Sequence, residues 1–482
     1  MKKSIKRNML MNMLLSVSNF VFPLITYSYV ARILLPEGTG KINFAQSVLS
    51  IFSYIASLGI YNYGIRECAK VRNDREKLSK LAQEIIAVNL IATVFAYLLL
   101  NGAILLIPKL NSNGLLIMVM SSSMLLNVLG IEWLYVAMEM YSYITIRSLL
   151  FKTLSVVLIF LLVHTREDYI IYGALTIFAS SASYILNFIN ARKYIDFKRF
   201  GQYNLKQHIK PIMVFFSSSI IITVYGQFDS LMIGFLKGDI ENGIYGAAVK
   251  IKSIVTALTA SIGSVFIPQI TIGFKEQNGK GITDLLTKYM RMVCLLVWPV
   301  AIFSAICARD LLLFVCGAEY LNADSTLVVL MICTVILTGT NLFGNLILVP
   351  RGNEGKVSTS VLIGLLINVC GNFLMIPHWG ALGAAIATAL TETFNLCFMG
   401  NQCRTLSREL KASLNIKKYV IPLAASALIL FVFVKYGVPG NVFVRLVIQT
   451  VVMFGIYYCS LIVLKEPIIW SVLKKCWKRK NR

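Results

Sequence analysis

The sequence predicts an all-α integral membrane protein, and three observations support this fold class. First, 57% of the 482 residues are hydrophobic and only 14% are charged, whereas about 25% of a soluble domain is charged. Second, apolar runs long enough to cross about 30 Å of hydrocarbon recur along the whole chain. Third, basic residues concentrate in alternate connecting segments. This composition excludes a soluble globular protein and an intrinsically disordered one.

Fourteen apolar runs are predicted to be transmembrane helices, because an open sheet cannot satisfy its backbone hydrogen bonds in lipid. The runs are 9–33, 42–62, 82–107, 113–136, 143–163, 168–190, 211–236, 243–270, 289–308, 325–349, 356–377, 381–403, 419–438 and 443–464. The first is too long for a cleaved signal peptide and is predicted to be retained. Small residues at 364–389 predict close helix packing, with a tight turn at Pro377 and His378.

The distribution of Lys and Arg predicts the orientation. Of the 46 basic residues, 35 lie in segments on the side of the N-terminus and 8 lie in segments on the other side. By the positive-inside rule, both termini are predicted to be cytoplasmic and the number of spans even. The same rule explains the formal net charge of +24 without any nucleic-acid partner.

A weak internal repeat agrees with this topology. The basic segment 191–210 separates the first six spans from the next six, and both halves begin with a span that leaves the cytoplasm. The segments 40–45 and 243–248, which lead into spans 2 and 8, share the pattern G-x-x-x-x-A. We therefore predict an N-lobe at 1–200, a C-lobe at 201–405, and two C-terminal helices with a basic tail at 406–482.

Ionisable residues inside spans are candidate functional residues, because a charge within hydrocarbon is costly. Lys250 and Lys252 lie deep in span 8, but they point about 200° apart on a helix, so at most one is expected to face a central cavity. Asp229 in span 7 and Glu392 in span 12 could balance a cavity Lys or bind a coupling cation. Each could instead be a hydrogen-bonded acid in a helix contact.

Further candidates lie nearer the membrane surfaces. Arg147 is close to the cytoplasmic start of span 5, where a long side chain could also snorkel to water. Glu132 lies at the cytoplasmic end of span 4, and Arg32 lies at the outer end of span 1. Arg66 and Arg72 follow span 2 and could draw an anionic headgroup to a cytoplasmic opening, although orienting the chain is their simpler role.

No metal and no cofactor is expected. The ten cysteines form no C-x-x-C pair, and the three histidines lie far apart and near no cysteine. No Walker motif is present, and the predicted outer loops are all short. The chain is therefore predicted not to be an enzyme, and its work must take place within or across the helix bundle.

Five local patterns occur in an order that resembles a known transporter group. They are A-R-I-L-L-P-E-G-T-G at 31–40, Y-G-I-R-E-C-A at 63–69, E-W-L-Y at 132–135 with E-x-Y-x-Y-I at 139–144, Asp229 with G-I-Y-G-A-A-V-K at 243–250, and Asn368, Asn372 and Pro377 with G-A-L-G-A-A-I-A-T at 380–388. The group is the polysaccharide-transport branch of the multidrug/oligosaccharidyl-lipid/polysaccharide exporter superfamily, which includes Wzx-type flippases. Leu35, Thr39 and Ala137 depart from its usual Gly, aromatic and Gly.

The resemblance implies two six-helix lobes around a central cavity, followed by two C-terminal helices. It implies a flippase in the bacterial inner membrane for O-antigen, capsule or exopolysaccharide synthesis. Such a protein moves undecaprenyl-pyrophosphate-linked oligosaccharide from the cytoplasmic to the outer leaflet by alternating access of its two lobes. The implied partners are that lipid-linked oligosaccharide, membrane lipids, and the polysaccharide polymerase and chain-length machinery.

The resemblance also implies roles for the candidate residues. A cationic cavity would attract the diphosphate, and carboxylates would balance its charge or couple an ion. The implied substrate-binding residues are Arg32, Arg147, Lys250 and Lys252; the implied charge-balancing or ion-coupling residues are Asp229, Glu392 and Glu132; and Arg66 and Arg72 would lie at the cytoplasmic entrance.

Other functions are weighed against this one. A drug or organic-cation exporter of the same superfamily should have an acidic cavity and usually has twelve spans. A lipid II flippase typically carries several arginines in its first two spans, where this chain has only Arg32. A membrane enzyme such as the polymerase that joins repeat units usually has a large outer loop, and no such loop is predicted here. No re-entrant filter motif indicates a channel.

Overall fold

A computed structural model describes residues 5–276, 279–437, 440–471 and 474, and this part of the chain contains helices and no β-strand. Eleven of the described helical segments are long and apolar enough to cross a membrane, which confirms the predicted all-α membrane fold. Met13–Val71 has 59 residues and Glu354–Gln402 has 49. Each is more than twice as long as one crossing requires at 1.5 Å per residue. The number fourteen stays a prediction, and the basic tail beyond Lys474 lies outside the described residues.

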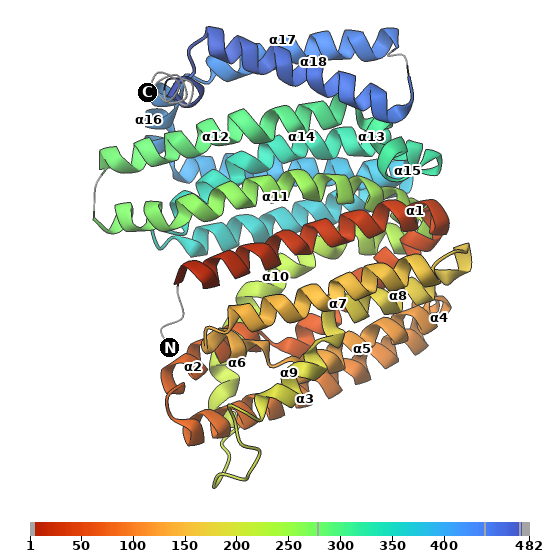
Figure 1. The fold of residues 1–482 in the computed structure, drawn as a ribbon, viewed down its shortest axis with the longest axis vertical. Coiled ribbons are helices and arrows are strands. Elements are labelled where there is room, and N and C mark those ends of the chain that lie inside the picture. The colour runs from red at the N-terminus through yellow and green to blue at the C-terminus, as the bar shows by residue number, and fades with distance from the viewer. Residues whose placement is uncertain (1–4, 277–278, 438–439, 472–473, 475–482) are drawn as a thin grey trace. The chain divides into compact units, whose positions relative to one another are not determined.

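The contacts divide the chain into two compact units, Met1–Gly243 and Ile244–Arg482. The N-lobe at 1–200 and the C-lobe at 201–405 were predicted from the internal sequence repeat, and they stay a prediction. The first unit contains α1 (Ile5–Ser57), α2 (Ile60–Val71), α3 (Arg75–Leu106), α4 (Pro108–Ser112), α5 (Gly114–Gly130), α6 (Glu132–Ala137), α7 (Tyr141–Leu162), η1 (Arg166–Asp168), α8 (Tyr169–Ile177), η2 (Phe178–Ala182), α9 (Tyr184–Ala191), α10 (Lys206–Leu236) and the first turn of α11 (Asp239–Lys275) (Figure 1).

The second unit contains the rest of α11 and seven further α-helices. They are α12 (Gly279–Ile306), α13 (Ala308–Val315), α14 (Asp324–Asn341), α15 (Glu354–Gln402), α16 (Arg404–Leu414), α17 (Lys417–Tyr436) and α18 (Val442–Val463), with η3 (Ala318–Ala323) and η4 (Leu342–Leu348) between them. Near the end of the chain, Tyr419 Oη donates to Glu466 Oε1 at 2.7 Å. This buried bond fastens α17 to the segment after α18.

The two longest helices each contain a backbone break. In α1 the break is at Leu35, with φ 58° and ψ 179°, and Pro36 follows it. A residue before proline is disfavoured in the α region, and proline is well suited to begin the next helical segment. In α15 the break is at Gly380, with φ 53°, a conformation that glycine adopts easily. The turn predicted at Pro377 and His378 therefore lies a few residues later, because Pro377 is still inside the helix.

Small residues bring the two arms of α15 together, as predicted for 364–389. A Cβ added at Gly371 would lie 3.0 Å from the Ala387 Cβ. A Cβ added at Gly364 would lie 2.9 Å from Asn395 Oδ1. Close approach of this kind gives helices in lipid the van der Waals contact that the hydrophobic effect does not provide there.

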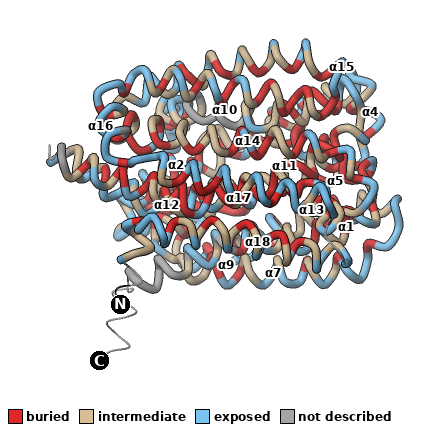
Figure 2. The backbone as a smooth tube through the Cα atoms, turned by 90° about the horizontal axis from the view of Figure 1, so that it is seen from above, coloured by how far each residue is buried: buried red, intermediate tan, exposed pale blue. Residues whose placement is uncertain are grey.

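Exposed apolar side chains mark the surface that faces lipid. On α3, Leu90, Ile91, Val94, Phe95 and Leu98 are all exposed, and their spacing places them on one face of the helix. Along helices such as α7, buried and exposed positions alternate (Figure 2). A continuous exposed apolar face would be an aggregation hazard in water, so this surface fits a helix bathed in lipid.

The segment of α1 just after its break touches the first turn of α11 at two glycines, both within the first unit. A Cβ added at Gly40 would lie 1.7 Å from the carbonyl oxygen of Asp239, and one added at Gly243 would lie 1.9 Å from that of Pro36. The contact is reciprocal: each glycine faces the carbonyl of the residue that lies four positions before the other glycine, Asp239 before Gly243 and Pro36 before Gly40. Asn242 Nδ2 also donates to the carbonyl of Gly40 at 3.2 Å. The two segments of the weak repeat therefore meet at equivalent positions.

Candidate functional site

The most deeply buried of the predicted cations is Arg147 on α7. Arg147 is only 5% exposed, and its Nε and Nη1 atoms have no hydrogen-bond partner among the described residues. The guanidinium carbon lies 5.4 Å from the ring centroid of Tyr184 and 5.9 Å from that of Tyr143. Cation–π contacts of this kind stabilise the charge in part, but they leave the N–H groups unsatisfied. These two nitrogens together carry three N–H donors, which an anionic group would satisfy.

Glu132 lies in the same part of the first unit, at an irregular point of the fold. It begins α6 directly after Ile131, whose φ of 36° separates α5 from α6. Positive φ is unusual for a β-branched residue, and strained backbone often occurs at functional sites. Glu132 is close enough to Tyr184, Tyr61 and Lys152 to interact with each electrostatically.

Lys152, further along α7, extends towards α1. Its Nζ donates to Ser18 Oγ at 3.0 Å and also contacts Asn19 Oδ1. We call Glu132, Arg147, Lys152, Tyr61 and Tyr184 the Arg147 cluster. It brings together two cations, one carboxylate and two aromatic rings from α2, α6, α7 and α9, inside a bundle whose outer surface is apolar.

The other candidates in the first unit have different surroundings. Arg32 is exposed. Arg66 Nε pairs with Glu67 at 2.8 Å, and Arg72 Nη1 pairs with Glu139 at 2.8 Å. Exposed pairs of this kind contribute about 0–1 kcal/mol and exchange partners easily. Asp229 on α10 is buried, at 9% exposure.

Three candidates lie in the second unit. Lys250 and Lys252 are both half-buried on α11. Glu392 on α15 is buried at 6% exposure, next to the fully buried Thr391. The structure therefore distributes the predicted residues over both units, and it gathers Arg147 and Glu132 around Tyr184. Their roles in binding substrate or ions stay predictions.

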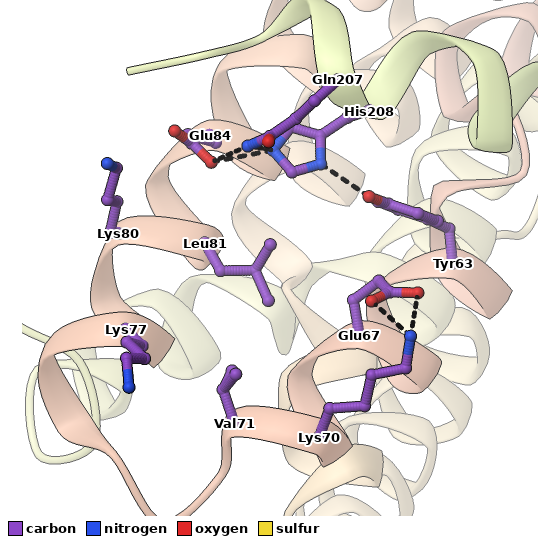
Figure 3. Close-up of a pocket in the computed structure, with 10 residues that line it drawn as sticks. All are labelled: Tyr63, Glu67, Lys70, Val71, Lys77, Lys80, Leu81, Glu84, Gln207 and His208. Carbon is purple, nitrogen blue, oxygen red and sulfur yellow. Dashed lines mark hydrogen bonds and ion pairs between the residues drawn. The ribbon is translucent and has the colours of Figure 1, made fainter. Parts of the chain in front are cut away.

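The sequence analysis missed a buried polar chain between α3, α10 and α2. His208 Nε2 lies 2.8 Å from Glu84 Oε2, and His208 Nδ1 lies 2.6 Å from Tyr63 Oη (Figure 3). Glu84 also accepts from the backbone N–H of Asn204 at 2.9 Å and from Gln207 Nε2 at 3.2 Å. With its donors in place, the carboxylate satisfies N–H groups at the start of α10, as a helix cap does.

The segment before α10 is fastened along one face of α3. Arg75, Ser79 and Gln83, spaced four residues apart, all contact Asp196 or its backbone. Arg75 Nη2 pairs with Asp196 Oδ1 at 2.7 Å, Ser79 Oγ accepts from the Asp196 N–H at 2.9 Å, and Gln83 Nε2 donates to the Asp196 carbonyl at 2.6 Å. The Arg75 hydrogen bond lowers the pKa of Asp196 below its usual value. We call these contacts, together with those of Glu84, the linker clasp.

Among the described residues, no group of three or more His, Cys, Asp or Glu side chains could hold a metal ion. Six of the nine described cysteines are buried. Buried cysteines in a helical bundle act as small apolar side chains.

Comparisons with known proteins agree with this architecture. A family model described as "Polysaccharide biosynthesis protein" matches residues 5–274. An Escherichia coli (strain K12) protein named "Putative O-antigen transporter" is 22% identical over 81% of this chain and 94% of its own length. A Haloferax volcanii protein named "Probable low-salt glycan biosynthesis flippase Agl15" is 24% identical over 37% of this chain and 38% of its own length.

Two solved structures share the fold. The lipid II flippase MurJ in an inward closed conformation superposes with a TM-score of 0.73 at 14% identity, covering 96% of this chain and all of MurJ. A multidrug resistance transporter of the MATE family, in an inward-facing conformation, gives a TM-score of 0.66 at 14% identity, covering 82% of this chain and 95% of its own. Both similarities concern the fold.

Proposed function

Because the chain belongs to the polysaccharide biosynthesis protein family, a family of membrane flippases, we propose that it flips undecaprenyl-pyrophosphate-linked oligosaccharide repeat units. Movement is from the cytoplasmic to the outer leaflet of the bacterial inner membrane, with both chain termini in the cytoplasm. The two predicted lobes alternate in opening a central cavity to each side. The product is handed to the polymerase and chain-length machinery on the outer side.

The observation that carries this proposal is the buried guanidinium of Arg147. Arg147 makes no ion pair with a described residue, and an unpaired cation inside a membrane bundle is costly and marks a functional site. Guanidinium N–H groups match phosphate oxygens in spacing and charge. A diphosphate is the part of a lipid-linked sugar that would satisfy both unpartnered nitrogens, while the polyprenyl tail stays in lipid.

The remaining residues of the Arg147 cluster suit the same substrate. Lys152 adds a second positive charge, and Glu132 limits the net charge so that the diphosphate can also leave. Tyr61 and Tyr184 offer apolar rings with a polar tip, which can pack on a sugar or carry its hydroxyl hydrogen bonds. In the second unit, Lys250 or Lys252 contributes further positive charge, and Asp229 and Glu392 balance charge or couple an ion.

The test is the sidedness of the lipid-linked units in intact cells. A membrane-impermeant label is applied to cells that lack the protein, to cells with the wild type, and to cells with Arg147→Gln. We expect R147Q to leave intact units unlabelled, as in the deletion, while its membrane level equals that of the wild type. Arg199→Gln, at an exposed arginine, is the matched control and should label as the wild type does.

Two results would refute the assignment. Normal labelling in the R147Q variant would remove Arg147 from the mechanism. Normal labelling in the deletion strain would show that the substrate is something else, and lipid II and drug-efflux assays would then decide between the other transporters that share this fold.

A further inference from the structure

The first unit has a pocket of about 410 Å³ between α2, α3 and the start of α10. Figure 3 shows that the two helices diverge from their connecting turn and that Leu81 and Val71 lie between them. Each helix contributes one face: Tyr63, Glu67 and Lys70 from α2, and Lys77, Lys80 and Glu84 from α3. His208 and Gln207 of α10 close the inner end. The pocket shares no residue with the Arg147 cluster, although Tyr63 of the pocket and Tyr61 of the cluster both lie on α2.

The length of α3 places the pocket at the level of lipid headgroups. The helix has 32 residues and is therefore about 48 Å long, whereas the hydrocarbon takes about 30 Å. Its C-terminal end is apolar and open to lipid, with Leu105 and Leu106 at 77% and 82% exposure. The excess length thus lies at the charged N-terminal end, which contains Lys77, Lys80 and Glu84.

The two carboxylates of the pocket are already satisfied. Glu67 receives Arg66 Nε and Lys70 Nζ, each at 2.8 Å. Glu84 receives the bonds of the linker clasp described above. Carboxylates held by several donors repel an incoming anion much less than free ones do, because the donors offset their charge.

The lysines of the pocket, by contrast, have N–H groups available to bind an incoming anion. Among the described residues, Lys77 forms an ion pair with Asp74 alone, at 3.0 Å, and both side chains are well exposed. Such a pair is weak and exchangeable. Lys80 makes no ion pair or side-chain hydrogen bond with a described residue. Lys70 lies across the pocket from them, donates to both oxygens of Glu67 at 2.9 and 2.8 Å, and keeps the third of its three donors.

We propose that this pocket binds a phosphate group of a lipid headgroup or of a soluble phosphorylated molecule. Lysine is a compact point charge suited to phosphate, and Lys70, Lys77 and Lys80 approach the pocket from both helices. Val71 and Leu81 can accept the apolar part of a headgroup next to the phosphate. The proposal goes beyond the proposed function, since transport through the Arg147 cluster does not require a second anion site.

The experiment measures binding to the full chain purified in nanodiscs. Calorimetric titration with inorganic diphosphate tests the soluble source, and native mass spectrometry of discs containing phosphatidylglycerol or only phosphatidylcholine tests the lipid source. Lys80→Gln is the variant, and Lys193→Gln, at an exposed lysine on the same predicted face, is the matched control. Thermal melting of both variants checks that they are folded.

We expect Lys80→Gln to weaken binding about tenfold, because it removes one charge-assisted hydrogen bond, and Lys193→Gln to leave it unchanged. Loss of diphosphate binding supports a soluble ligand, and loss of retained phosphatidylglycerol supports a lipid ligand. If K80Q and K193Q behave alike with both probes, the pocket is not a phosphate site. That result would leave the Arg147 proposal standing, because the sidedness assay tests it separately.

Discussion

The reciprocal glycine contact between α1 and α11 makes a sharp prediction about Gly243→Ala. The new Cβ would lie 1.9 Å from the carbonyl oxygen of Pro36 and 2.6 Å from its carbonyl carbon. Cβ atoms are essentially never found within 3.0 Å of another atom, so the two backbones would have to separate by about 1 Å. No side chain can yield here, because the obstacle is itself backbone.

The cost follows from overpacking and lost hydrogen bonds. Forcing an extra carbon into a close-packed contact costs about 1–3 kcal/mol. The shift would also strain the bond from Asn242 to the Gly40 carbonyl and the bond from Asn43 Nδ2 to the Asn242 carbonyl, each contributing about 1 kcal/mol. We expect a loss of about 3–5 kcal/mol in the stability of the first unit. For a unit of this size, that lowers the melting temperature by on the order of 10 °C.

The assay is thermal unfolding of the purified protein, followed by tryptophan fluorescence. Gly263→Ala is the matched control, since it makes the same change on the same helix and its Cβ would meet nothing within 4 Å. Alanine is the better helix former by about 1 kcal/mol, so G263A should melt at or slightly above the wild-type temperature. A G243A variant that melts with G263A would refute the close contact.

Three further predictions concern other parts of the first unit. His208→Ala should cost about 1–3 kcal/mol because it removes one buried hydrogen-bond partner from Glu84 and one from Tyr63, and thermal melting of H208A checks this. Tyr63→Phe should cost less, since it removes a single hydrogen bond, so a larger loss than in H208A would contradict the geometry. The lowered pKa of Asp196 means that its pair with Arg75 stabilises the clasp above the usual pKa of about 3.9 and is lost as pH falls through the lowered value. Limited proteolysis should therefore cut the wild-type segment faster only under strongly acidic conditions, and at neutral pH it should cut the Asp196→Asn variant faster than the wild type. Equal rates for the two proteins at neutral pH would contradict this.

Much of the fold could be predicted from the sequence, because lipid imposes a length and a composition on each helix. Most of the apolar runs lie within the described membrane helices, their number of fourteen stays a prediction, and the small residues at 364–389 do pack closely. What the sequence did not show is where a helix changes direction. The break at Ile131 directly follows Gly130, but it lies inside the apolar run 113–136 and has no proline beside it, and the break of α15 falls at Gly380 although Pro377 is the stronger sequence signal.

The candidate site was predicted in part. Charge inside an apolar run was enough to select Arg147 and Glu132, since such residues are rare in spans. Glu84 also lies inside a predicted span, at 82–107, but its partner His208 lies more than a hundred residues away in a polar segment, so nothing local indicated the pair. The regular spacing of Arg75, Ser79 and Gln83 was the available signal of the clasp. That spacing could be interpreted as a binding face only once residues 196–208 are known to lie beside α3.

The linker clasp has a consequence for the continuity of the chain. Residues on both sides of Gly201 are fastened to α3, at Asp196 and at Asn204 to His208, whereas Gly201 and Gln202 are exposed and a Cβ at Gly201 would meet nothing within 4 Å. The peptide bond between Gly201 and Gln202 therefore adds little stability, because non-covalent contacts already hold the chain on both sides of it against α3. A chain divided there into two separately expressed fragments should still assemble, with α10 seated on α3. An epitope inserted at the same point should be tolerated and would report the side of the membrane on which it lies.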